Sequence, residues 1–477
     1  MLSPCLAQVP TRLYTIDQVV PPYIYVFYVA FVVSFLLTPL MRVVAMYYGV
    51  IDRPDNARKI HTVPIAYLGG VAVFMGWLAG LAASQFLVLH RSEVGWPTNY
   101  PVVKFSIVIG GLVIVVLGLW DDTIGVKPRV KIFGQVAAAV FLLWDGVGLE
   151  AAKPLLQTIM TKLVQVPGVL RLFYGGVRPE NLVPDWLIVA CSSVLVIGII
   201  VVCCNASNLM DGLDGLCGGV TAIIAAGFLF VAVHLAMVGG GINTNWDALR
   251  VILGLALLGA VLGFVPFNFN PASIFMGDTG SMLLGYSCGT MIIMLAQQQA
   301  KWGLAAMVIF ALPILDTVLA FARRWIKGRS IFEADRGHFH HQLVARGFTI
   351  KQTVLISYGL SILFALLGVS MVFIRTRYTV AVYVVIFAYV IVAAFKMGMV
   401  HERPRVVRRQ DLDAGSAGET HAVIEPATVL EIADDDRSLA GDTGSNGAGS
   451  APARPNSAQT ESPERTARAS VEVAPRA

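Results

Sequence analysis

The stretch "FSIVIGGLVIVVLGLWDDTIGVKPRVK" (residues 105–131) joins an apolar run to two adjacent aspartates and then to three bases. Its first part, 105–120, carries no charged side chain. A helix needs about 20 mainly apolar residues to cross the hydrocarbon core of a bilayer, and the run approaches that length. We therefore expect a membrane-spanning helix that ends at the carboxylates of Asp121 and Asp122.

Apolar runs of this kind recur along the chain. Of its 477 residues, 56% are hydrophobic and 14% are charged, and the mean hydropathy is +0.71. Soluble domains carry about 25% charged residues, so the composition excludes an ordinary soluble protein. We predict an all-α polytopic membrane protein of about eleven transmembrane helices, with the N-terminus outside and the C-terminus cytoplasmic. The expected spans are 24–47, 68–89, 105–120, 132–149, 186–204, 218–238, 250–266, 281–297, 303–323, 353–374 and 378–397.

One further segment, 155–174, is semi-apolar and could be counted as a twelfth span. It contains Lys162, Arg171 and a Pro-Gly pair near its middle. A base at the centre of a spanning helix costs about 2.5–3.5 kcal/mol on insertion. We therefore interpret the segment as an interfacial or loop element. The first span begins about 20 residues into the chain and lacks a basic leader and a cleavage site, so we expect it to be retained rather than removed as a signal peptide.

The composition changes after the last expected span. From about residue 410 the chain is rich in Gly, Ser, Pro and Ala and lacks hydrophobic periodicity, which is typical of disorder. We therefore divide the chain into a membrane domain, 1–400, and a disordered cytoplasmic tail, 401–477. Residues 410–477 hold twelve acids and five bases, so the rest carries +12 within an overall charge of +5. The excess of positive charge would favour binding of anionic lipids and phosphorylated substrates. Alternatively, it only sets the orientation of the chain in the membrane.

Five polar clusters fall on the cytoplasmic side in this arrangement. Each begins at or near the end of an odd-numbered span, so all five meet at one membrane face. Counting 155–174 as a span would divide them between two faces, which is a second argument against that count. The clusters are "DRPDNARKIHTVPIAYLGG" (52–70), "DDTIGVKPRVK" (121–131), "NASNLMDGLDGLCGG" (205–219), "NPASIFMGDTGS" (270–281) and "ADRGHFHHQL" (334–343).

The clusters bring acids and an amide to the edge of the hydrocarbon, where ionisable groups are costly and are therefore candidates for function. Such hard oxygen ligands suit Mg²⁺ or Mn²⁺, which commonly share ligands with a substrate's phosphates. Together with the neighbouring bases, they point to phosphoryl-group chemistry. Each cluster alone could equally be a polar loop or turn at a helix end. The residues concerned are Asp121, Asp122, Asp211, Asp214, Asp278 and Asn208.

Three histidines, His338, His340 and His341, form a second candidate site. A structural zinc site needs four close N or S ligands, and this loop offers no cysteine. Imidazoles beside Arg336 fit contacts to a polyphosphate or nucleotide better. Asp316, within the preceding span, is either a functional buried charge or a packing group of its helix.

Together and in this order, the five quoted clusters resemble the polyprenyl-phosphate N-acetylhexosamine-1-phosphate transferases. The resemblance covers roughly residues 24–400 and excludes the tail. Within that superfamily, "ADRGHFHHQL" resembles the bacterial branch that uses UDP-N-acetylglucosamine (UDP-GlcNAc) and starts O-antigen (lipopolysaccharide), teichoic acid or arabinogalactan-linker synthesis. The muramoyl-pentapeptide branch usually carries a more continuous histidine triplet there.

The resemblance implies an enzyme of the bacterial inner membrane whose active site faces the cytoplasm. A polyprenyl phosphate, undecaprenyl or decaprenyl, would attack the β-phosphorus of UDP-GlcNAc, so that UMP leaves and polyprenyl-diphosphate-GlcNAc stays in the membrane. The implied cofactor is Mg²⁺, with Mn²⁺ as a substitute. The partners are the two substrates and membrane lipid, with no nucleic acid, and a homodimer is a further candidate assembly.

The resemblance also implies roles for single residues. Asp278 resembles the family's metal-binding aspartate, with Asn208 beside the metal and the diphosphate. Asp121 and Asp122 match a catalytic acidic pair, one of which positions or deprotonates the lipid phosphate. Lys131 matches a lysine that binds the diphosphate or the lipid phosphate.

Asp211 and Asp214 match a second catalytic acidic pair. Their implied role is to organise the site or the nucleotide. The other substrate-binding candidates would hold the diphosphate or sugar; they are Lys59, His61, Arg336, His338, His340 and His341. We favour direct single displacement over a covalent aspartyl intermediate.

Two alternatives stay open from the sequence. One is the sister transferase that uses UDP-MurNAc-pentapeptide in peptidoglycan synthesis. The other is a transporter of metal ions or phosphate compounds, which would explain acids inside a polytopic bundle. A transporter explains less well why the acids gather on one face, because translocation pathways place polar groups near the bilayer midplane.

Overall fold

The structure is a computed structural model that describes residues 15–52, 64–91, 103–164, 183–238, 245–326 and 337–375, with a few single positions between 328 and 392. The chain divides into one unit of Met1–Arg405 and another of Val406–Ala477. The second unit lies outside the described residues, so the disordered tail stays a prediction.

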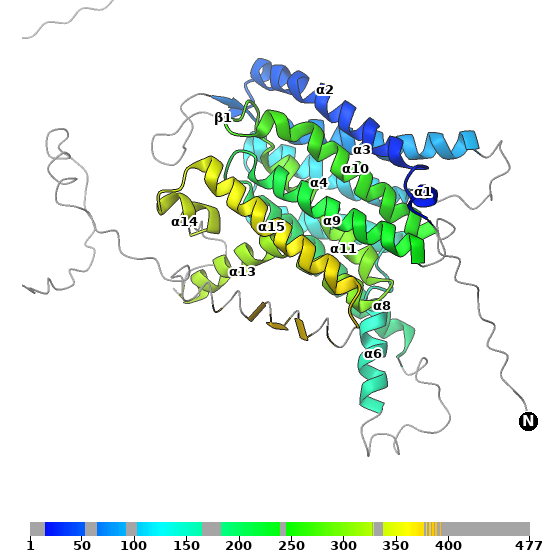
Figure 1. Cartoon of the computed structure of the whole chain (residues 1–477). Coiled ribbons are helices and arrows are strands. Elements are labelled where there is room, and N and C mark those ends of the chain that lie inside the picture. The colour runs from blue at the N-terminus through cyan, green and yellow to red at the C-terminus, as the bar shows by residue number, and fades with distance from the viewer. Residues whose placement is uncertain are drawn as a thin grey trace, which may run out of the picture. The chain divides into compact units, whose positions relative to one another are not determined.

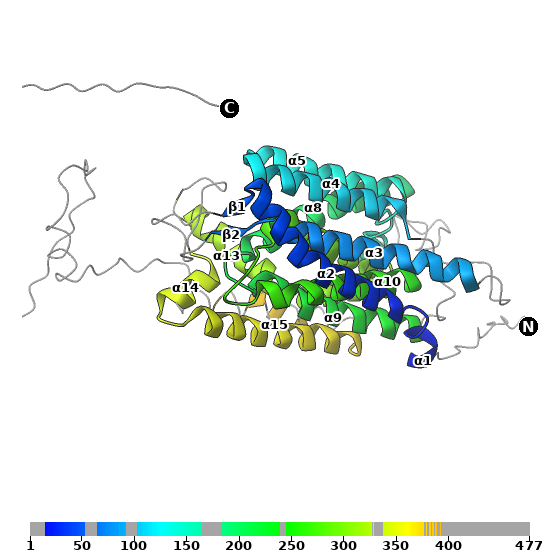
Figure 2. The same cartoon turned by 90° about the horizontal axis from the view of Figure 1, so that it is seen from above.

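The described chain is helical apart from one short pair of strands. Its helices are α1 (Ile16–Val19), α2 (Ile24–Tyr48), α3 (Gly69–Arg91), α4 (Phe105–Ile124), α5 (Pro128–Trp144), α6 (Lys153–Val164), α8 (Asp185–Met210), α9 (Leu216–Val238), α10 (Asn245–Asn268), α11 (Gly277–Ala296), α12 (Ala300–Ile309), α13 (Ala311–Ile326), α14 (Phe339–Ala345) and α15 (Ile350–Val372); the strands are β1 (Ile51–Asp52) and β2 (Ile65–Ala66). Figures 1 and 2 show β1 and α14 at one end of the bundle and α1 at the other.

The all-α, multi-pass character predicted from the sequence is confirmed. Eight of the described helices are long and apolar enough to cross a membrane, and a bent pair raises the number to nine. The expected count was eleven. The fourth expected span is the 17-residue α5, and the eleventh, 378–397, lies almost wholly outside the described residues.

One expected span, 303–323, is broken in two. The helices α12 and α13 meet at Phe310 with a bend of 76°. Pro313 lies in the first turn of α13 and has no N–H to continue the hydrogen-bond ladder of α12, which accounts for the break.

The segment 155–174 is described only in its first half, where it forms α6. The described part of this helix has 12 residues and ends where the described range 103–164 ends. The interpretation of 155–174 as an interfacial or loop element stays a prediction.

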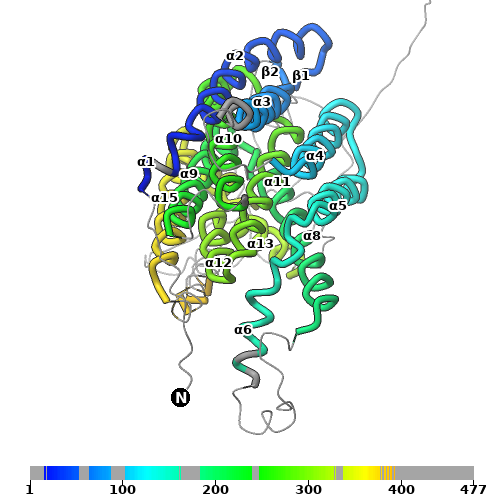
Figure 3. Tube along the Cα trace, turned by 90° about the vertical axis from the view of Figure 1, so that its right-hand side faces the viewer, coloured from blue at the N-terminus to red at the C-terminus, as the bar shows by residue number. Residues whose placement is uncertain are grey.

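The most deeply buried helix is α11. All of its candidate spanning window is buried inside the protein, and α3, α4, α8, α9, α10 and α12 contact it. Figure 3 looks along the bundle and shows α11 among these helices. Glycines permit the close approach: a Cβ on Gly70 would collide with Gly280, and a Cβ on Gly118 would collide with Thr279. Small residues at such crossings are the usual packing device in membranes.

Both ends of α11 meet charged side chains from other helices. At its C-terminus, Arg250 of α10 donates from Nε to the carbonyl of Met294 at 3.0 Å and pairs with Asp247 at 2.5 Å. Arg250 and Asp247 are each 1% exposed. A cation is favourable at this end of a helix because the macrodipole is negative there. The N-terminal end carries the candidate site.

A backbone junction joins two of the polar clusters at that end. Strand β2 pairs with β1 and also forms a bridge through Ala66 to Ile274. The first N–H of α3, on Gly69, then donates to the carbonyl of Phe275 at 3.0 Å. The segment that enters α11 is therefore held against the start of α3.

Candidate active site

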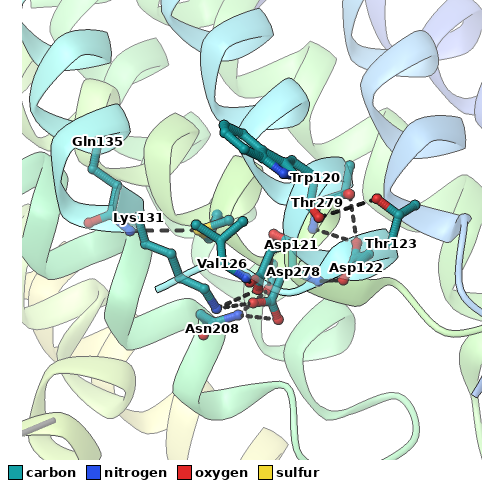
Figure 4. Close-up of polar contacts among 12 residues, drawn as sticks. Trp120, Asp121, Asp122, Thr123, Val126, Lys131, Gln135, Asn208, Asp278 and Thr279 are labelled. Carbon is teal, nitrogen blue, oxygen red and sulfur yellow. Dashed lines mark hydrogen bonds and ion pairs between the residues drawn. The ribbon is translucent and has the colours of Figure 1, made fainter. Parts of the chain in front are cut away.

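The centre of the candidate site is Asp278, in the first turn of α11 (Figure 4). Lys131 approaches from the start of α5, and its Nζ lies 2.5 Å from Asp278 Oδ2. Asn208, near the end of α8, donates from Nδ2 to Asp278 Oδ1 at 2.8 Å and to Ser281 Oγ at 3.0 Å. Three helices thus bring a carboxylate, an ammonium and an amide together.

Asp121 completes this group from the last turn of α4. Its Oδ2 lies 2.5 Å from Lys131 Nζ, and its Oδ1 accepts a hydrogen bond from the N–H of Val126 at 2.7 Å. The turn between α4 and α5 makes this geometry, since Gly125 adopts φ +79° and Pro128 begins α5. The Lys131 ammonium therefore lies between two carboxylates that are 147 and 10 residues away in sequence.

The neighbouring carboxylate, Asp122, has different partners. Its Oδ1 accepts from the N–H of Asp278 at 2.8 Å. Its Oδ2 accepts from the N–H of Thr279 at 3.0 Å and from Thr279 Oγ1 at 2.7 Å. The two N–H groups belong to the first turn of α11 and have no acceptor within that helix. Asp122 therefore acts as an N-terminal cap supplied by another helix.

The second acidic pair lies in the turn between α8 and α9. The helix α8 ends at Met210, and Gly215 takes a positive φ of 78° just before α9. Asp214 Oδ2 accepts from Asn270 Nδ2 at 2.9 Å and from the N–H of Ala272 at 3.0 Å. Asp214 is therefore bonded to the segment that leads into α11.

Asp211 has no hydrogen-bond partner for its carboxylate among the residues that the structure describes. Burial, together with the charges of Asp278, Asp122 and Asp214, raises the pKa of Asp211 to about 8. A carboxylate in this setting is stabilised by any cation that enters the cluster, because a positive charge favours the ionised form.

The histidine cluster meets the same turn. Asp316 of α13 accepts from the backbone N–H of Phe339 at 2.8 Å, and its Oδ2 lies 3.0 Å from His338 Nδ1. His340 is 2% exposed, and its Nε2 has no hydrogen-bond partner in the described chain. A Cβ on Gly212 would collide with that Nε2, so the imidazole lies against the turn that carries Asp211. Burial lowers the pKa of His340 to about 3, and the ring is neutral at physiological pH.

The donor set fits a hard divalent cation shared with a substrate. Among the described residues, no three or more His, Cys, Asp and Glu side chains are grouped so that they alone could hold a metal ion. Mg²⁺ does not need such a group, since it is usually held by one or two carboxylates, waters and substrate phosphates. The carboxylate of Asp278, with the side chain of Asn208 beside it, suits this arrangement.

The structure brings together most of the residues that the sequence singled out. Direct contacts join Asp278 to the three residues Asp122, Lys131 and Asn208, and they join Lys131 to Asp121. Asp211 and Asp214 lie in the turn 211–215, and His340 lies against Gly212 of the same turn. Three predicted residues are outside the described part and stay predictions: Lys59, His61 and Arg336.

Three polar residues at this end were missed by the sequence reasoning. Thr279 contacts Asp122 and Ser281 contacts Asn208, and only their place within three residues after Asp278 could have pointed to them. Tyr67 lies close enough to the acids that burial, Asp52 and Asp211 raise its pKa. The sequence signal for Tyr67 was its place in the first polar cluster, two residues before a pair of glycines.

Comparison with known proteins identifies relatives over most of the membrane part. The sequence pattern of glycosyl transferase family 4 matches residues 104–296. The decaprenyl-phosphate N-acetylglucosaminephosphotransferase of Mycobacterium tuberculosis (strain H37Rv) is 32% identical over 367 residues, which are 74% of this chain and 83% of that protein. The probable undecaprenyl-phosphate N-acetylglucosaminyl 1-phosphate transferase of Bacillus subtilis is 29% identical over 381 residues, 79% of this chain and 93% of that protein. The phospho-N-acetylmuramoyl-pentapeptide-transferase of Desulforudis audaxviator is 27% identical over 356 residues, 72% and 96% of the two chains.

Proposed function

Because the chain belongs to glycosyl transferase family 4, the polyprenyl-phosphate N-acetylhexosamine-1-phosphate transferases, we propose that it transfers GlcNAc-1-phosphate from UDP-GlcNAc to a polyprenyl phosphate. The products are UMP and polyprenyl-diphosphate-GlcNAc, the first lipid-linked intermediate of an envelope polysaccharide. The names of the two more similar relatives support GlcNAc over the muramoyl-pentapeptide donor. The observation that carries the proposal is the Asp278, Lys131, Asp121 and Asn208 cluster at the end of α11.

The cluster suits a reaction between two phosphorylated substrates. Lys131 binds a phosphate or diphosphate group, and Asp121 positions or deprotonates the attacking lipid phosphate. The second pKa of that phosphate is about 6, so it is largely ionised at neutral pH. An oxygen of the lipid phosphate forms a bond to the β-phosphorus while the bond to the UMP oxygen breaks. Asp278 and Asn208, joined by Asp211, would hold Mg²⁺, which neutralises charge on the diphosphate.

The histidine cluster is proposed to hold the nucleotide sugar. Asp316 accepts from His338 Nδ1, which orients the ring and leaves Nε2 for a ligand. His340 is held against Gly212 and is neutral, so it offers a hydrogen bond rather than a charge. His341 lies beside His340, with ring centroids 4.3 Å apart. The cluster therefore adds polar contacts for the diphosphate or sugar next to Asp211.

We further propose that this end of the bundle faces the cytoplasm of a bacterial inner membrane. Nucleotide sugars are cytosolic, and the lipid phosphate reaches the site from the bilayer that surrounds α4 and α5. The lipid side of these helices is apolar: Trp120 is 52% exposed and Phe133 is 75% exposed. A homodimer stays a prediction.

The proposal is tested with purified protein in detergent, undecaprenyl or decaprenyl phosphate, Mg²⁺ and a panel of UDP-sugars. We expect UMP release and a lipid-linked product with UDP-GlcNAc and neither with UDP-MurNAc-pentapeptide. Turnover with the pentapeptide alone would identify the sister transferase. Transport of a phosphate compound into vesicles without UMP release would identify a transporter.

A further inference from the structure

In each of the two acidic pairs, the two carboxylates have different surroundings. In the first pair, Asp121 contacts Lys131, whereas Asp122 is bonded to the start of α11. In the second pair, Asp211 has no partner within the described chain, whereas Asp214 is bonded to the segment before α11. One carboxylate of each pair is thus directed to the candidate site and the other to the backbone that carries Asp278.

The contacts of Asp122 use both of its oxygens. Three donors reach it, the N–H groups of Asp278 and Thr279 and the hydroxyl of Thr279, at 2.7–3.0 Å. A Cβ on Gly277 would lie 2.5 Å from Asp122 Oδ2, so the carboxylate also packs against the backbone just before Asp278. A group with this many short contacts is not free to bind a substrate phosphate or to accept its proton.

The contacts of Asp214 hold the other end of the same segment. Asp214 accepts from Asn270 and Ala272, and the next residue, Gly215, donates to Asn268 Oδ1 at 3.1 Å. The side chain of Asn268 in turn donates to the carbonyl of Ile274 at 3.0 Å. The stretch from residue 268 to 279 is therefore fastened at both ends by carboxylates from other elements.

We propose that Asp122 and Asp214 are positioning residues, which fix the segment 268–279 so that Asp278 faces Lys131 and Asn208. Asp121 and Asp211 are the members of the two pairs that meet substrate and metal. The inference rests on the proposed function, which it deepens by dividing four similar carboxylates into two roles. It also assigns Thr279 a supporting part, since its hydroxyl is one of three donors to Asp122.

The test measures metal binding without turnover. Mn²⁺ affinity is determined by electron paramagnetic resonance on the purified full-length protein and its variants. Asp122→Asn keeps one acceptor oxygen for three donors, so Asp278 is misplaced and Mn²⁺ affinity falls by about tenfold. Thr279→Val removes one donor and lowers the affinity by about threefold. Because both changes act through the same contact, the double variant is no weaker than Asp122→Asn.

Matched controls are available in the same protein. The hydroxyl of Thr123 is exposed and bonds only to carbonyls of its own helix, so Thr123→Val leaves Mn²⁺ affinity unchanged. Asp185 begins α8 at the other end of that helix from Asn208, and Asp185→Asn also leaves it unchanged. A second measurement is thermal unfolding of Asp122→Asn, Thr279→Val and the double variant without metal. It detects whether the effects of the two substitutions on stability are coupled.

The outcomes separate the two proposals. Normal Mn²⁺ affinity and normal unfolding in Asp122→Asn, combined with lost UMP release, would show that Asp122 acts on a substrate and would overturn the positioning role. Fully additive effects of Asp122→Asn and Thr279→Val would overturn it as well. If the wild-type protein releases no UMP from any UDP-N-acetylhexosamine, the proposed function fails, while the coupling in unfolding still decides whether Asp122 holds α11.

Discussion

Substitution of Gly277 by alanine tests the geometry at the start of α11 most directly. Gly277 adopts φ +70°, which an alanine reaches only at a cost of about 1–2 kcal/mol. Its new Cβ would also lie 2.5 Å from Asp122 Oδ2 and 2.9 Å from Asp122 Cγ. The substitution therefore combines backbone strain with a collision against a single carboxylate.

The size of the collision follows from the distances. An ordinary contact for a Cβ begins at 3.4 Å, so the carboxylate must retreat by roughly 1 Å. Hydrogen bonds of 2.7–3.0 Å to Thr279 and Asp278 would then exceed normal hydrogen-bond lengths. A hydrogen bond to a charged group contributes about 1.5–3 kcal/mol, so losing one brings the total destabilisation to about 2.5–5 kcal/mol.

The control is Gly146→Ala. Gly146 adopts φ +82° after α5, and a Cβ there would meet nothing within 4 Å, so this variant carries the backbone strain alone, about 1–2 kcal/mol. Free energies of unfolding are measured for both variants by denaturant titration in detergent micelles, with UMP release measured in parallel. Equal destabilisation of the two variants would refute the contact between Gly277 and Asp122 on which the reasoning rests.

Four further outcomes are expected. Lys131→Met leaves Asp121 and Asp278 without their shared cation and should lower kcat for UMP release by at least about a hundredfold; a loss below threefold would contradict the central role of the lysine. Gly212→Ala should displace the His340 ring and weaken UDP-GlcNAc binding by calorimetry, whereas unchanged affinity would remove that histidine from the donor site. Gly125→Cys and Phe348→Cys should react with a membrane-impermeant thiol reagent from the same, cytoplasmic side, and labelling from opposite sides would exclude a composite site. A chain that stops after residue 410 should keep its turnover per folded molecule, and loss of turnover at normal membrane levels would assign the tail a function.

The membrane class and the ingredients of the site are local properties of the sequence. The run 105–120 shows its helix by length and composition alone, because a bilayer imposes one hydrophobic thickness on every span. The polar clusters follow odd-numbered spans, so chain order alone predicts that they meet. The bend within 303–323 could not be predicted from hydropathy, because the apolar run continues through both α12 and α13. In the sequence only Pro313 indicates where the helix breaks.

Which neighbour each carboxylate contacts was decided by the tertiary structure. Asp121 and Asp122 are the same residue type and are adjacent in sequence, so composition and spacing treat them alike. On a helix with 3.6 residues per turn they project about 100° apart, and they must therefore face different neighbours. Packing of α4 against α5 and α11 directs Asp121 to Lys131, ten residues along the chain, and Asp122 to the first turn of α11, which lies more than 150 residues away. The sequence by itself predicted that acids would lie at the ends of apolar helices, whereas the packing of α4 against α5 and the distant α11 determined which neighbour each acid contacts.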